Sequence, residues 1–79
     1  LVTLMPEIAG LHYEVIVGSC VAERDGMYLE LYDGEDLLLE VFYSDVDGAM
    51  TFSAFQQDLP LAVVEWALAE GKARLMPER

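Results

Sequence analysis

The stretch DLPLAVVEWALAEGKARL, residues 58–75, decides how the rest of the chain is interpreted. A proline near the start and good helix formers after it predict a helix over residues 58–75, with Asp58 as its N-cap. Ala67 and Gly71 lie beside one apolar stripe of this helix, which we expect to cover the core. At about 100° per residue, the stripe consists of Leu61, Val64, Leu68 and Leu75.

The opposite side of this helix is also apolar, which is unusual for a surface helix. Trp66 falls nearly opposite the core stripe, among small residues that would let another surface approach closely: Ala62, Ala69 and Ala73. Because Trp is enriched at interface anchors, the leading hypothesis is a subunit or partner interface. Two alternatives stay open, namely cover by residues 1–8 of the same chain and simple partial exposure.

Upstream of the helix, turn signals alternate with β-type runs. Asp-Gly pairs in RDGM (24–27), YDGED (32–36) and SDVDG (44–48) predict three hairpin turns. We therefore predict an α+β fold in which a four-stranded antiparallel β-meander over residues 11–56 is followed by one C-terminal helix packed on one sheet face. Residues 1–10 form an N-terminal segment of the same single domain, which spans residues 1–79.

The turns also predict the strand register. A two-residue turn at Asp25 and Gly26 would set Cys20 opposite Leu31, and a bulge or bend is expected at Gly18. A three-residue turn with Gly34 left-handed then sets the leucines of the next two strands against one another. The core face of this sheet is predicted to consist of Met27, Leu29, Leu31, Leu37, Leu39, Val41, Met50, Phe52 and Ala54.

The other sheet face is predicted to mix carboxylates with aromatic side chains. Glu30 and Glu40 are expected as diagonal neighbours on adjacent strands, with Leu38 beside them. A solvated sheet face normally carries charged and small polar residues instead of aromatic ones. This face is therefore a second candidate partner or dimer interface, with four aromatic side chains: Tyr28, Tyr32, Phe42 and Phe55.

The charge is strongly acidic and unevenly spread. The 79 residues include 15 Asp and Glu and 4 Lys and Arg, which gives a formal net charge of −11. The chain has no Lys or Arg between Arg24 and Lys72. The negative electrostatic potential of these carboxylates repels the phosphate backbone of nucleic acids, so we expect no direct nucleic-acid binding. The charge either keeps a small apolar protein in solution or favours a basic protein partner.

Side chains that could carry chemistry are few. His12 and Cys20 are the single histidine and the single cysteine, and neither is expected to lie near a catalytic or metal-binding partner. The Asp-rich segments 33–36 and 45–48 resemble fragments of calcium loops but are better explained as hairpin turns. We therefore predict no catalytic residue, no metal and no cofactor, and a protein that is not an enzyme.

The small size bears most directly on function. A core of this size gives a thin stability margin, and one cysteine allows no disulfide within the chain, so self-association is the expected additional source of stability. Neither a membrane span nor a signal peptide is recognisable, and we expect a cytoplasmic location. The leading hypothesis is a non-catalytic protein-protein interaction module that forms a homodimer. The alternative is an acidic inhibitor, of immunity, antitoxin or anti-defence type, of a basic or nucleic-acid-binding partner.

Overall fold

The computed structural model describes residues 1–77. The predicted domain spans residues 1–79, so its last two residues lie outside this part. No helix within residues 1–77 is long and apolar enough to cross a membrane. The elements are β1 (Val2–Leu4), β2 (Glu7–Ile8), β3 (Leu11–His12), β4 (Glu14–Cys20), β5 (Gly26–Asp33), β6 (Asp36–Ser44), β7 (Met50–Ala54) and α1 (Leu61–Leu75).

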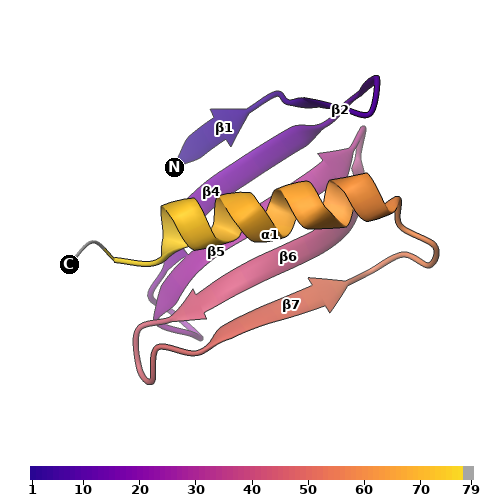
Figure 1. The fold of residues 1–79 in the computed structure, drawn as a ribbon. Coiled ribbons are helices and arrows are strands. Elements are labelled where there is room, and N and C mark those ends of the chain that lie inside the picture. Colours follow the sequence, from indigo (N-terminus) through magenta and orange to yellow (C-terminus); the bar gives the residue numbers. More distant parts are fainter. Residues whose placement is uncertain (78–79) are drawn as a thin grey trace.

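The main sheet is antiparallel and has the order β1-β4-β5-β6-β7, with α1 crossing one of its faces (Figure 1). This confirms the predicted α+β class with one C-terminal helix. The predicted strand number is wrong, because the sheet has five strands. The additional strand comes from the N-terminal segment, where Val2 pairs with Val17 and Leu4 with Val15.

The chain between β1 and β4 makes a sharp reversal. Ala9 and Gly10 both have positive φ, 51° and 84°, and they connect the small hairpin of β2 and β3. The backbone N–H of Tyr13 then donates a hydrogen bond of 3.0 Å to the carbonyl of Pro6. The first strand of the predicted meander, which begins at residue 11, is therefore divided at Tyr13, whose side chain is buried in the core.

The first long hairpin has a different turn from the predicted one. Gly26 belongs to β5, where it pairs with Cys20, and residues 21–25 form the loop. Leu31 consequently pairs with Val15 and not with Cys20. Packing explains the glycine, because a Cβ at position 26 would collide with the backbone carbonyl of Tyr43 on the neighbouring strand.

The second hairpin contains the predicted left-handed glycine, since Gly34 has a φ of 61°. Its loop is one residue shorter than predicted, with Asp33 paired to Asp36. The pairing shifts between Leu31 and Tyr32, so that Leu38 on β6 is left without a partner. A β-bulge leaves one extra residue unpaired and re-orients its side chain. Leu38, which was predicted to lie on the outer face, therefore belongs to the buried core cluster.

The bulge or bend predicted at Gly18 is absent from the described pairing. β4 and β5 keep one continuous register through the pair Gly18 and Tyr28. A Cβ at position 18 would lie 2.6 Å from the hydroxyl oxygen of Tyr28, so the glycine makes room for this side chain across the strand. A glycine in a strand can mark such a close approach as well as a bulge.

The orientation of the helix differs from the predicted one. α1 begins at Leu61, with Pro60 at the N-cap position, and Asp58 lies upstream with a φ of 55°. Leu61 is 71% exposed and Leu68 is 38% exposed, so the predicted core stripe is wrong for both. The buried residues of the helix are Val63, Ala67, Gly71 and Leu75.

Small residues explain this rotation. A Cβ on Gly71 would lie 2.8 Å from Cγ1 of Val41, so the glycine lets α1 approach β6 closely. Ala67, one turn earlier, is also fully buried. The contact between helix and sheet is therefore set by the residues that permit close approach. The largest fully buried side chains of the core are those of Leu29, Leu31, Leu39, Val15 and Val63.

Candidate interaction surfaces

The Trp66 side of α1 is partly covered by the protein itself. Trp66 is half-buried and packs against the core cluster, to which Ile8 of β2 belongs. The helix lies over β5 and β6 and against β2 (Figure 1). This arrangement favours cover of the tryptophan within the chain. The three alanines that were predicted to surround Trp66 are exposed: Ala62, Ala69 and Ala73.

The aromatic side chains of the outer sheet face do not form one open patch. Tyr28 and Tyr32 are half-buried, and the hydroxyl of Tyr32 donates a 3.1 Å hydrogen bond to Glu30. Phe42 is buried, because the Arg24 guanidinium lies 3.9 Å from the centre of its ring. Phe55, just beyond β7, is exposed. The part that these residues play in association stays a prediction.

A third surface, formed by α1 and β7, exposes larger apolar side chains. Leu61 and Leu68 lie on the flank of α1 away from Trp66, and Phe52 of β7 is 41% exposed. Phe52 pairs with Val41, which lies directly under Gly71, so its side chain is on the helix face of the sheet. We call this the α1/β7 surface, and it comprises Met50, Phe52, Ala54, Leu61, Val64 and Leu68.

The position of β7 explains why this surface is uncovered. The flank of α1 beside β2 is covered by the N-terminal segment, so the exposed flank is the one beside β7 (Figure 1). β7 is the last strand of the sheet and lies outside the cover of the helix. This surface was not predicted from the sequence, because Leu61, Leu68 and Phe52 were assigned to the core.

A signal for this surface is nevertheless present in the sequence. Residues 48–57, GAMTFSAFQQ, contain no charged side chain in a chain with a formal net charge of −11. This segment includes the whole of β7. An edge strand of a soluble sheet is commonly protected by charged side chains or proline, and β7 has neither.

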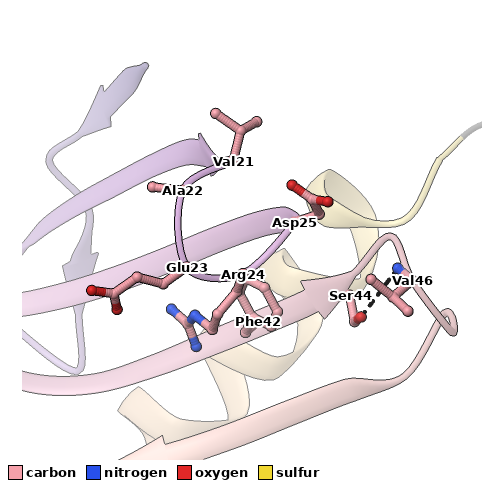
Figure 2. Close-up of a pocket in the computed structure, with 8 residues that line it drawn as sticks. All are labelled: Val21, Ala22, Glu23, Arg24, Asp25, Phe42, Ser44 and Val46. Carbon is pink, nitrogen blue, oxygen red and sulfur yellow. Dashed lines mark hydrogen bonds between the residues drawn. The ribbon is translucent and has the colours of Figure 1, made fainter.

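A pocket of about 390 Å³ lies at one end of the sheet, between the 21–25 loop and the start of the 45–49 loop (Figure 2). The backbone N–H of Asp45 donates a 2.9 Å hydrogen bond to the carbonyl of Asp25 and holds the two loops together. Arg24 contacts both carboxylate oxygens of Glu40, at 3.2 and 2.9 Å. This ion pair uses two of the five N–H donors of the guanidinium and offsets its positive charge, which disfavours binding of an anion in the pocket.

The ion pair of Arg24 and Glu40 also balances a local concentration of negative charge. Glu30 and Glu40 are direct cross-strand partners instead of diagonal neighbours, because the shorter turn and the bulge each move the register by one residue. Like charges directly opposite destabilise a sheet. Arg24 relieves this repulsion, and the contact with Glu40 raises the pKa of the guanidinium.

Cys20 is half-buried at the end of β4, next to the same loop. Backbone N–H groups of the loop, that of Arg24 first, stabilise the thiolate and lower the pKa of Cys20. The predicted register set Cys20 opposite Leu31, whereas in the structure it pairs with Gly26 and lies beside Arg24. This difference follows from the altered turn, which brings the Arg24 loop beside Cys20.

His12 and the acidic turns lie at the surface of the protein. Nε2 of His12 lies 3.6 Å from Oε1 of Glu7, and both side chains are exposed. In the 45–49 loop, Asp47 accepts a 3.0 Å hydrogen bond from the backbone N–H of Ala49, as expected of a turn. Within residues 1–77, no three His, Cys, Asp or Glu side chains are placed to hold a metal ion.

Comparisons with protein-family models, with curated proteins and with solved structures found no match.

Proposed function

We propose that this protein is a non-catalytic interaction module that self-associates through the α1/β7 surface. The observation that carries the proposal is the grouping of exposed apolar side chains: Phe52, Leu61 and Leu68 lie on one side of the molecule and are 41%, 71% and 38% exposed. Single exposed apolar residues are normal on a soluble protein. A contiguous group is typical of an interaction site.

The charge distribution supports a second copy as the partner. Two chains that each carry a formal net charge of −11 repel one another, and this repulsion falls off over about 10 Å at 0.1 M ionic strength. Contact is least costly where carboxylates are far away. Residues 48–57 supply the longest uncharged segment of the chain, and they form one side of the α1/β7 surface.

Light scattering coupled to gel filtration tests this proposal. At micromolar concentration we expect a mass of twice the 8.8 kDa of the chain. A Phe52→Lys variant should run as a monomer, because it places a charge at the centre of the surface. The matched control is Leu11→Lys, which changes an exposed leucine on β3 in the same way and should leave the mass unchanged. A monomeric wild-type protein overturns the proposal.

An acidic partner surface is the second candidate, and the turn between β5 and β6 favours it. Asp33, Glu35 and Asp36 are all exposed there, and Glu30 and Glu40 lie beyond them on the outer sheet face. Such a surface suits a basic protein whose association is steered by charge. The two functions respond oppositely to salt: self-association of like-charged chains is preserved or strengthened by salt, whereas binding to a basic partner is weakened.

A further inference from the structure

The outer edge of β7 carries unpaired peptide groups. The N–H of Phe55 donates to the carbonyl of Leu38, and the carbonyl of Ala49 accepts from Ser44, both at 2.9 Å. In an antiparallel pair, alternate residues direct their peptide groups to the same neighbouring strand. The peptide groups of the remaining residues of β7 therefore point away from β6: those of Met50, Phe52 and Ala54.

This edge is well suited to pairing with another strand. β7 keeps one continuous register with β6 along its length, so that its outer side is straight. Its five residues, MTFSA, include no proline and no charge. Natural edge strands are commonly protected by charge, proline or a bulge, and an edge without such protection is a template for another strand.

The opposite edge of the sheet is a weaker candidate. β1 has three residues, Val2–Leu4, and is followed closely by Pro6, which has no N–H to donate. β7 is longer and lies beside the exposed flank of α1, so that pairing there also buries apolar side chains.

We propose that β7 pairs antiparallel with β7 of a second copy, across a two-fold axis at Phe52. This inference rests on the proposed self-association and specifies its geometry. In this register Met50 lies opposite Ala54 of the second copy, and each outward-pointing residue has a partner with which it exchanges two hydrogen bonds. The two sheets join into one continuous sheet.

The register is compatible with the side chains on both faces. On the helix face, the two Phe52 rings meet between the exposed flanks of the two helices, where Leu61 and Leu68 lie. On the outer face, Thr51 lies opposite Ser53 of the second copy, and both side chains are small and polar. The central pairing therefore brings no carboxylate opposite another, as the net charge of −11 requires.

Cysteine cross-linking tests this register. In a Cys20→Ser background, one protein carries Thr51→Cys and the other Ser53→Cys, and both positions are exposed. In the proposed pair, Cα atoms 51 and 53 of different copies lie about 4.5 Å apart. Two residues 51, or two residues 53, are diagonal neighbours about 8 Å apart, which is too far for a disulfide.

The two proteins are refolded together and oxidised, and non-reducing electrophoresis with mass spectrometry identifies the product. We expect a disulfide between residues 51 and 53 in the mixture, and at least tenfold less cross-linked dimer in either protein alone. Light scattering on the same samples separates the outcomes. A dimer that gives no 51–53 cross-link, or cross-links equally well from one protein, overturns the strand pairing alone. A monomeric mass overturns the self-association as well, and this result would point to a different occupant of the β7 edge.

Discussion

Replacing Leu75 and Leu61 separately by alanine measures how α1 is oriented on the sheet. Both leucines belong to the stripe that helical periodicity assigns to the core, but Leu75 is 2% exposed and Leu61 is 71% exposed. A Leu→Ala change at a buried site removes apolar burial and leaves a cavity, at a cost of about 2.7 to 5 kcal/mol. Leu75 ends the helix, where neighbouring chain can relax into the space, so we expect about 3 kcal/mol.

Leu61→Ala should lower the free energy of unfolding by about 0.5 kcal/mol, as is usual for surface substitutions. Because about 1 kcal/mol shifts the Tm of a domain of this size by about 4 to 8 °C, the Leu75→Ala variant should melt about 12 to 24 °C lower. Urea unfolding followed by circular dichroism gives both values. Measurements at two protein concentrations separate any contribution from association. Equal losses for the two variants would refute the helix orientation.

Three further predictions concern the loops at the Arg24 end of the sheet. Gly26→Ala should cost about 2 kcal/mol or more in urea unfolding, because its Cβ collides with the backbone of Tyr43, and an unchanged midpoint would contradict this packing. Cys20 should react with iodoacetamide faster in the folded than in the urea-unfolded protein at pH 7.5, because loop N–H groups lower its pKa, and equal folded and unfolded rates would count against the assignment. Arg24→Gln keeps these N–H groups and removes only the smaller contribution of the Arg24 charge, so it should slow the reaction slightly. A backbone N–H lowers the pKa of Asp47, so this carboxylate contributes stability above its unfolded pKa of about 4 that is lost as pH falls through the lower folded value. Asp47→Ala should therefore be less stable than the wild type at pH 7, with the difference disappearing below pH 4, and a difference that persists at pH 2 would argue against this origin.

The alternation of apolar residues and the Asp-Gly pairs were sufficient to predict the strands β4 to β7, but not the exact turns between them. Leu29, Leu31 and Val41 face the core as predicted, because burial of one face fixes which residues point inward. The predicted strand geometry was wrong at the two glycines whose role is to make room for a neighbouring strand. Gly26 makes room for a neighbouring strand and Gly18 for the Tyr28 ring, and neither contact is visible in local sequence.

The helix orientation could not be predicted because apolar size and burial do not coincide in α1. Helical periodicity predicts that the side with the larger residues, Leu61 and Leu68, faces the core. In the structure the side with Ala67 and Gly71 packs on the sheet instead. Close approach to Val41 requires the small side chains. Leu61 and Leu68 are consequently exposed. For this reason the candidate interface is the flank of α1 beside β7 and not the Trp66 side of the helix.

The candidate surface was within reach of the sequence in one respect. The uncharged segment 48–57 stands out in a chain with a formal net charge of −11, and the predicted meander already places its strand at an edge. The exposure of Leu61 and Leu68 beside this strand was not predicted, because both were assigned to the core. The N-terminal strand β1 adds to the opposite end of the sheet, beside β4, so β7 keeps its edge position with the exposed flank of α1 next to it.

Hydrogen exchange at the β7 amides tests the central claim most directly. The N–H groups of Phe52 and Ala54 point away from β6, so they should exchange rapidly in a monomer and slowly in a dimer joined through β7. The amides of Thr51 and Ser53, which face β6, provide the internal control, because dilution to the monomer should affect them far less. We predict that protection of Phe52 and Ala54 is present at high protein concentration and disappears on dilution. Rapid exchange of both amides at concentrations where light scattering gives the dimer mass would contradict the account.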